Sequence, residues 1–193
     1  MKEYIWSRPQ ITPLPALVEG REGAVRLLSG GGWRLWRSRE RDFCPKYLDG
    51  INREGAGWED VEISMQLKPF DREYAYAYEL ELPAQWRGKR IFLRFDGVNC
   101  KARVMIDGKP VREHYGGFVS WDCEITDAVA GGGRHLLALG VKDDPGGICT
   151  FHFGGIIRDV SLFTVPQVYL SRFHGETSFD AAYRDAELKI YAQ

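Results

Sequence analysis

Histidine and cysteine are the residues that most often bind metal ions or act as nucleophiles, and this sequence has four of each. Among them, only Cys149 and His152 lie within a few positions of one another, three apart. A tetrahedral metal site needs a second pair of ligands at a similar spacing, and the sequence contains none. We therefore predict no metal site, and we expect the cysteines to be reduced and mainly buried.

His152 stands between two aromatic residues, Phe151 and Phe153, with Gly154 and Gly155 directly after them. A polar ring between aromatic rings could line a pocket for a sugar. The same ring could satisfy its hydrogen bonds within a loop and have no further role. We favour the loop histidine and keep the sugar pocket as the functional alternative.

Carboxylates could supply acid and base catalysis, but no pair stands out. Glu79 and Glu81 are predicted on the outward face of a strand, where charged side chains meet solvent. Asp143 and Asp144 precede a Pro-Gly-Gly sequence and are typical of a turn, although loops also carry many binding residues. Cleavage of a glycosidic bond needs two carboxylates ~5–10 Å apart, and the sequence singles out no such pair. Nucleophile-elbow and phosphate-loop motifs are absent too.

The elements that would position these residues are β-strands. Residues 73–82 carry an aromatic residue or Leu at every even position and Ala or Glu at every odd one. Such alternation predicts a half-buried strand, because successive side chains point to opposite faces. Asp107 and Gly108 stand between two apolar runs and predict a hairpin turn, because both central residues of the preferred turn need positive φ.

Short apolar runs predict the remaining strands. They lie at residues 33–36, 61–65, 91–95, 103–106, 109–111, 136–141, 160–165 and 186–191. A polar stretch, residues 174–185, precedes the last of them, and one helical turn is expected at 126–130. No crossover helix separates the strands, so the connections should be antiparallel. Together with 22 Gly and 9 Pro, this pattern predicts an all-β sandwich.

The composition excludes several classes of protein. A chain of 193 residues can form one large domain, or one domain and part of a second. A hydrophobic share of 44% excludes disorder, and no apolar run reaches the ~20 residues of a membrane helix. Basic residues number 26 and acidic residues 27, without the basic excess expected of a nucleic-acid-binding protein. Because the first residues lack a secretory signal, we expect a cytoplasmic protein.

Four parts of the sequence, two of them interrupted, match four motifs of one known protein family, and they occur in the same order as in that family. Residues 86–98 lead into F-x-G-V, residues 102–108 and 114–118 follow V-x-x-N-G and G-x-H-x-G-G-Y/F, and residues 122–127 and 136–141 follow F-D-I-T and alternating Leu and Val. Residues 154–162, Gly-Gly-Ile-Ile-Arg-Asp-Val-Ser-Leu, match G-G-I-x-R-x-V-x-L. The chain thereby resembles the N-terminal sugar-binding domain of family 2 glycoside hydrolases, the β-galactosidase and β-glucuronidase group. The resemblance implies a galactose-binding-like jelly-roll β-sandwich.

The resemblance also implies a domain order. Residues 1–165 would form the jelly roll, and residues 166–193 would be the first strands of an incomplete immunoglobulin-like domain. The family's catalytic (β/α)₈ barrel has no counterpart in this sequence, since neither Asn52 nor Asn99 is followed by Glu. The chain would then be a noncatalytic part of a glycoside hydrolase that needs no cofactor, with the remaining domains of the parent enzyme as partners. We expect the residues after Pro166 to be poorly ordered, to lie along the sandwich, or to pair with another copy, which leaves a homo-oligomer open.

Three residues are candidates for binding a β-galactoside or β-glucuronide. By the resemblance, Asp71 and Asp144 fall where loops of the family contact the sugar, and His152 is the third candidate. The alternative is that the two aspartates are ordinary loop carboxylates.

Three further residues are expected to support the fold. Arg158 stands at the start of a strand, where its guanidinium group could pair with a carboxylate or with carbonyl groups. Phe118 and Trp121 are expected in the core or at an interface. The alternative function is a self-sufficient carbohydrate-binding module, which would need exposed aromatic residues and convergent polar groups.

Overall fold

The computed structural model describes residues 24–37, 57–65, 67, 73–99, 101–142, 154–170 and 173–193. In these residues the secondary structure consists of β-strands, turns and short 3₁₀ helices, including η2 (Ala84–Trp86) and η3 (Asp127–Val129). The predicted turn at 126–130 is thereby confirmed. No helix in this part of the chain is long and apolar enough to cross a membrane. The strands are β1 (Val25–Leu27), β2 (Gly30–Arg37), β3 (Trp58–Ile63), β4 (Glu73–Leu82), β5 (Arg90–Phe95), β6 (Val98–Asn99), β7 (Lys101–Ile106), β8 (Lys109–Tyr115), β9 (Trp121–Glu124), β10 (Gly133–Lys142), β11 (Gly155–Ile156), β12 (Val160–Val165), β13 (Phe173–Phe179) and β14 (Ala186–Ala192).

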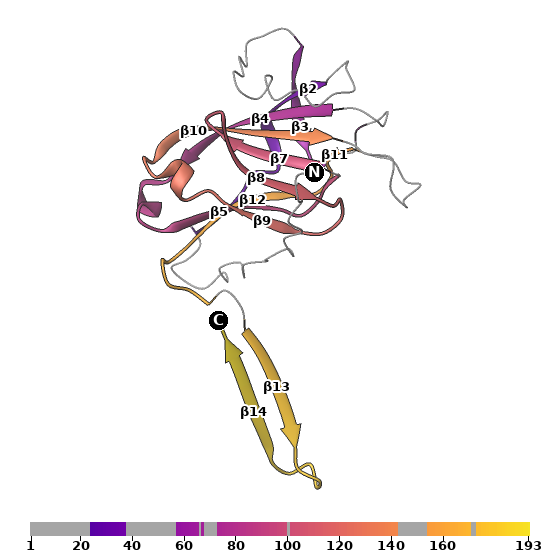
Figure 1. Ribbon diagram of the computed structural model, residues 1–193, viewed down its shortest axis with the longest axis vertical. Coiled ribbons are helices and arrows are strands. Elements are labelled where there is room, and N and C mark those ends of the chain that lie inside the picture. The colour runs from indigo at the N-terminus through magenta and orange to yellow at the C-terminus, as the bar shows by residue number, and fades with distance from the viewer. Residues whose placement is uncertain are drawn as a thin grey trace, which may run out of the picture.

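The strands form two main antiparallel sheets that pack face to face as a sandwich (Figure 1). One sheet has six strands in the order β3-β2-β4-β10-β7-β8, and the other has four in the order β1-β12-β5-β9. β11 pairs with β6 in a small third sheet. The predicted all-β jelly-roll sandwich is confirmed.

The core between the sheets is rich in aromatic residues. Trp121 is fully buried and stacks on Phe95, with 4.4 Å between the ring centroids. Burying each such side chain contributes on the order of 1.5–3 kcal/mol. Cys123 is free and buried, as predicted, and its burial raises the pKa of its thiol to about 12. The other three cysteines lie outside the described residues. Further large side chains in the core are Trp33, Tyr76, Trp86, Leu93 and Phe163.

The alternating segment forms the central strand β4, but it is buried on both faces over its first half. The even positions, among them Tyr74 and Tyr76, pack into the core as predicted. The odd positions Ala75 and Ala77 are buried too. Ala75 lies in a second apolar cluster with Met105 and Ala138, against which Trp36 and Trp58 pack. The prediction of a half-buried strand is therefore wrong for this half, because side chains of neighbouring strands cover its outer face.

The hairpin turn between β7 and β8 forms where the sequence predicts it. Asp107 has φ 50° and Gly108 has φ 76°, both in the left-handed region that such a turn requires. The Asp107 carboxylate also accepts a hydrogen bond from the Leu136 amide at 2.8 Å, and its other oxygen lies 2.7 Å from His135 Nδ1. The turn is thereby tied to β10.

The C-terminal strands β13 and β14 pair with each other and extend away from the sandwich as a separate hairpin (Figure 1). β13 occupies much of the segment described from sequence as a polar stretch. The register puts Thr177 opposite Leu188 and Phe179 opposite Ala186, so one face is largely apolar while the other carries pairs such as Glu176 and Lys189. The side chains of residues 174–193 are all exposed. The hairpin does not lie along the sandwich, and the assignment of residues 166–193 to a second domain stays a prediction.

Candidate functional site

The three predicted sugar-contacting residues, Asp71, Asp144 and His152, lie outside the described residues. Their nearest described neighbours along the chain are Glu73, Lys142 and Gly154. These neighbours lie at the end of the sandwich next to the predicted site. The side chains around them show which chemical groups are present at that end.

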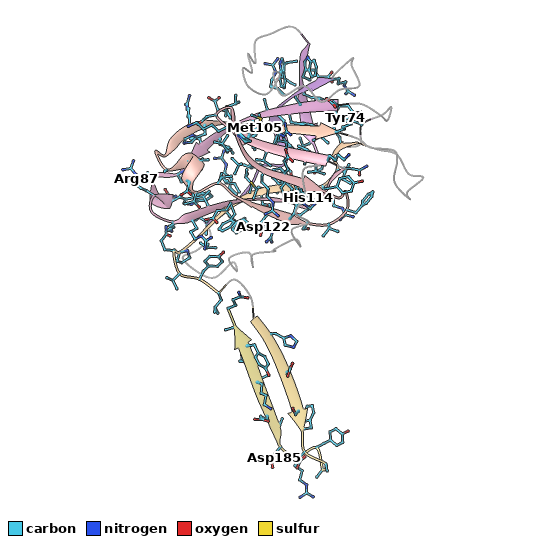
Figure 2. The ribbon with its side chains drawn as sticks, viewed as in Figure 1. Tyr74, Arg87, Met105, His114, Asp122 and Asp185 are labelled. Carbon is cyan, nitrogen blue, oxygen red and sulfur yellow. The ribbon has the colours of Figure 1, made fainter. Side chains whose placement is uncertain are left out.

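A continuous row of side chains crosses four strands of the six-stranded sheet at this end. Glu73 on β4 is paired with Lys142 on β10, Lys142 with Lys101 on β7, and Lys101 with Tyr115 on β8. Residues directly opposite one another in adjacent strands point to the same face, with Cβ atoms about 5 Å apart. We call these four residues the charged row. Tyr74, next to Glu73, marks this end of the sandwich in Figure 2, where Arg87 lies at the opposite end.

The charged row combines a buried carboxylate with more exposed ammonium and aromatic groups that can bind a polar ligand. The Glu73 carboxylate is only 5% exposed, and its Oε1 lies 3.6 Å from Lys142 Nζ. Lys101 Nζ lies 5.4 Å from the centre of the Tyr115 ring, at cation–π distance. Tyr115 itself is 46% exposed. Carboxylate and ammonium groups can hydrogen-bond hydroxyl groups, and an exposed aromatic ring can stack on an apolar ring face.

The start of β11, three positions after His152, is anchored on the core. Leu67 and Gly154 exchange backbone hydrogen bonds at 3.0 and 3.2 Å. Gly155 has φ 97°, and a Cβ at this position would overlap the Tyr76 hydroxyl group. That hydroxyl group is buried, which raises the pKa of Tyr76, and it accepts a hydrogen bond from the Ile156 amide at 3.4 Å. Only glycine combines this φ with so close an approach of the backbone.

The loop between β8 and β9, residues 116–120, is held from several sides. Arg158 Nη1 donates to the Phe118 carbonyl oxygen at 3.0 Å, one of the two kinds of contact predicted for this residue. Ser120 Oγ donates to Asp96 Oδ1 at 2.8 Å. Gly117 has no Cβ, which leaves room for the Asn99 side chain. Phe118 is 42% exposed, so it lies outside the core and presents an apolar surface in the loop that follows Tyr115.

His114 occupies the histidine position of the motif G-x-H-x-G-G-Y/F, and its side chain packs against the core. Its ring stacks on the buried Trp121 indole with 4.5 Å between centroids. Burial, and to a smaller extent the nearby Arg112 guanidinium, lowers the pKa of His114 to about 4. The ring is therefore neutral at pH 7. Figure 2 labels His114 and, close to it in this view, Asp122, the residue that follows Trp121 on β9.

No cluster of three or more His, Cys, Asp or Glu side chains that could hold a metal ion occurs within the described ranges. The charged row was not identified from sequence, because its members lie far apart in the chain and meet only through the strand register. Of its four members, only Glu73 was marked by a sequence pattern, as the first residue of the alternating segment.

Comparison with known proteins gives a consistent result. The family described as "Glycosyl hydrolases family 2, sugar binding domain" matches residues 63–166. A β-glucuronidase of Bacteroides fragilis is 38% identical over 102 residues, covering 50% of this chain and 15% of that protein. A β-galactosidase of Thermoanaerobacterium thermosulfurigenes is 31% identical over 120 residues, covering 57% of this chain and 17% of that protein. The chain therefore spans a small fraction of these relatives.

Solved structures show the same fold. The β-glucuronidase of Parabacteroides merdae superposes with a TM-score of 0.73 at 20% identity, covering 96% of this chain and 26% of that one. The β-glucuronidase of Bacteroides uniformis gives a TM-score of 0.66 at 23% identity, covering 79% of this chain and 20% of that one.

Proposed function

The chain belongs to glycosyl hydrolase family 2 as a sugar binding domain, and we propose that it is the noncatalytic N-terminal domain of a glycosidase. It supports the catalytic part of that enzyme and supplies loop side chains to the sugar subsite. The substrate is a β-galactoside or a β-glucuronide, the two classes that the names of the relatives specify. Hydrolysis takes place on carboxylates outside this chain.

The observation that carries the proposal is the pairing of Glu73 with Lys142. Asp71 precedes Glu73 by two positions, and Asp144 follows Lys142 by two positions. Two residues span at most about 7 Å of extended chain. Both candidate carboxylates are therefore tethered within a short reach of the same pair of strand ends, although 73 positions separate them in the sequence.

The chemistry of the charged row is compatible with a sugar. Two ammonium groups, one carboxylate and one exposed aromatic ring line the strand ends from which the candidate loops leave. Sugars are bound by polar groups of this kind together with aromatic faces. Exposed Tyr115 and Phe118 also keep a self-sufficient carbohydrate-binding module as the second candidate function.

The C-terminal hairpin supports the proposal that the chain continues into a further domain. Its apolar face carries Leu188 and Ile190, which are 61% and 65% exposed. An isolated two-stranded hairpin is marginally stable in water, and three or more strands are needed to bury such a face. Residues 166–193 fit the first strands of an immunoglobulin-like domain whose other strands cover this face.

The first experiment assays the purified chain on chromogenic β-galactosides and β-glucuronides and titrates it with the same sugars. We expect no turnover above background and no sub-millimolar binding, because the subsite is completed by other domains. Turnover would contradict a noncatalytic role. Sub-millimolar binding by the isolated chain would instead favour the carbohydrate-binding module.

The second experiment tests the loop residues in the parent polypeptide, meaning this chain followed by its catalytic part. Replacing Asp71 or Asp144 by Ala should lower kcat/KM about 10- to 100-fold, since a lost hydrogen bond to a charged group is worth roughly 1.5–3 kcal/mol. Asp127→Ala is the matched control, because Asp127 is exposed on η3, at the other end of β10. Equal effects of all three substitutions would argue against a sugar subsite at the charged row.

A further inference from the structure

The chain leaves the sandwich at the end opposite the charged row. β4 ends at Leu82, a short turn with η2 leads into β5 at Arg90, and the end of β12 lies beside it through the pairing of Val165 with Arg90. The segment after β12 then folds back onto this end. Gln167 Nε2 donates to the Gly88 carbonyl oxygen at 2.8 Å, and Tyr169 packs half-buried against Phe92.

Arg90 connects this returning segment to the sandwich. Its guanidinium carbon lies 5.5 Å from the centre of the Phe92 ring and 5.1 Å from the centre of the Tyr169 ring. The Phe92 and Tyr169 rings themselves meet edge to face, with 6.2 Å between centroids. One cation therefore contacts two aromatic rings, one on the sandwich and one on the segment that leaves it. Each such contact is favourable by cation–π attraction.

Glu124 on the neighbouring strand β9 fixes the orientation of the Arg90 guanidinium. Arg90 Nε and Nη2 donate to the two carboxylate oxygens of Glu124 at 2.8 and 2.6 Å. Thr126 Oγ1 donates to the same carboxylate at 2.9 Å. A bidentate pair holds the guanidinium in one plane, so that its faces remain available for aromatic contacts. We call Gly88, Arg90, Phe92, Glu124, Gln167 and Tyr169 the linker clamp.

We propose that the linker clamp fixes the path of the chain out of the sandwich, with Arg90 as the positioning residue for the C-terminal hairpin. The clamp holds the chain as far as Tyr169, and β13 begins four positions later at Phe173. Few residues are therefore left to absorb rotation between the sandwich and the hairpin. The proposal rests on the sandwich and its linker and is independent of sugar binding, so it stands or falls separately from the proposed function.

The chemistry of the clamp predicts which side chains can replace its members. Lysine at position 90 would keep the charge but lose the bidentate pair and the planar face. Phenylalanine at position 169 would keep a ring for both aromatic contacts. Arg90→Lys should therefore open the clamp, and Tyr169→Phe should preserve it. If only the positive charge at position 90 mattered, Arg90→Lys would leave the clamp closed.

The test compares Arg90→Ala, Arg90→Lys, Tyr169→Ala and Tyr169→Phe in the full chain, with Arg87→Ala as the matched control. Arg87 is exposed on the same turn, three positions from Arg90, and its replacement makes the same change in charge. Backbone ¹⁵N relaxation reports whether the hairpin tumbles with the sandwich and how well residues 167–170 are ordered. Dispersion of the sandwich amide signals verifies that each variant is folded.

We expect the hairpin to tumble with the sandwich in the wild type, in Arg87→Ala and in Tyr169→Phe. In Arg90→Ala, Arg90→Lys and Tyr169→Ala, the hairpin should tumble faster than the sandwich, and the ¹⁵N order parameters of residues 167–170 should fall from those of rigid backbone, about 0.85, to below about 0.6. Independent tumbling in the wild type would overturn the proposal. So would unchanged tumbling in both Arg90→Ala and Tyr169→Ala. If Arg90→Ala fails to fold, Tyr169→Ala still tests the clamp, because Tyr169 lies outside the two sheets.

Discussion

The sandwich and the C-terminal hairpin use the same antiparallel pairing but differ in what covers their side chains. In the sandwich, Leu93 on β5 is fully buried between the two sheets. In the hairpin, Leu188 on β14 is 61% exposed. Backbone pairing therefore forms in both regions, whereas burial is achieved in only one. Because burial supplies most of the stability of a fold, the two regions should respond very differently to the same kinds of substitution.

The largest difference between the two regions in the free energy of unfolding is expected when an ion pair is broken. Asp122 and Arg94 form two hydrogen bonds at 2.7 and 2.9 Å and are 3% and 7% exposed. Asp122→Asn should lower the free energy of unfolding by about 3–5 kcal/mol, because it leaves the buried Arg94 cation without its counter-ion. Glu187→Gln, which removes the exposed partner of Lys189 at 3.5 Å in the hairpin, should have no measurable effect. Urea unfolding followed by tryptophan fluorescence measures the sandwich variant, and the amide NMR signals of residues 173–193 follow the hairpin variant, because the hairpin has no tryptophan. Equal effects of the two substitutions would contradict the difference between the regions.

A matched pair of leucines tests burial directly. Leu93→Ala should destabilise the sandwich by about 2–5 kcal/mol, because it removes buried methyl groups and leaves a cavity. Leu188→Ala should stay within about 0.5 kcal/mol, since the side chain is largely solvated before the change. Chemical denaturation of the two variants provides the comparison. A large effect of Leu188→Ala would mean that the hairpin face is covered in solution, for example by a second copy.

A matched pair of glycines tests backbone geometry. Gly155→Ala should cost about 1–3 kcal/mol, because φ 97° is unfavourable for alanine and the new Cβ would meet the Tyr76 hydroxyl group. In the hairpin, a Cβ at Gly175 would have only an ordinary contact, 3.7 Å from Leu188 Cδ1. Gly175→Ala should therefore be neutral or slightly stabilising. Thermal unfolding distinguishes the two, and a neutral Gly155→Ala would show that β11 can move away from Tyr76.

The smallest effect on folding stability is expected from lowering the pH. The Arg90 guanidinium beside Glu124 holds the pKa of that carboxyl below its ordinary value of 4.5. Burial acts to raise the pKa of Asp107, but hydrogen bonds from His135 and the Leu136 amide outweigh it, and the pKa lies below 3.8. A carboxyl with a lowered pKa in the folded state stabilises the fold above its unfolded pKa, and this stability is lost as the pH falls through the folded value.

Stability should therefore decline as the pH falls below about 4.5, and the combined Asp107→Asn and Glu124→Gln variant should show a flatter profile below that pH. Glu187→Gln serves as the hairpin control and should leave the profile unchanged. Unfolding midpoints in urea between pH 6 and pH 3 test this. A variant profile as steep as that of the wild type would assign the acid sensitivity to other carboxyls.

Features set by neighbours in the chain could be predicted from the sequence. The strand at 73–82 and the Asp107-Gly108 turn depend on side-chain alternation and on local backbone preference, and both are present. The burial of Ala75 could not be predicted, because it depends on Trp36 and Met105 from strands distant in sequence. The strand β13 was not recognised within residues 174–185, because its exposed polar positions carry no burial signal.

The candidate site divides in the same way. Asp71, Asp144 and His152 came from motif order and from the aromatic residues around one histidine, and they remain predictions. The charged row depends on register, since Glu73, Lys101 and Lys142 become neighbours only when β4, β10 and β7 pair. Alternation shows which face a side chain occupies, but it does not show which residue lies opposite.

The full-length pairing of β4 with β10 also separates the two ends of the sandwich. From Glu73 paired with Lys142 to Leu82 paired with Gly133, the strands run side by side for ten residues, or about 30 Å at 3.3 Å per residue. The charged row lies at one end, and the linker clamp lies at the other. The hairpin tip near Asp185 points away from the sandwich (Figure 2). A coupling group placed at this tip would attach the protein to a sensor surface while leaving the proposed sugar-facing end free in solution.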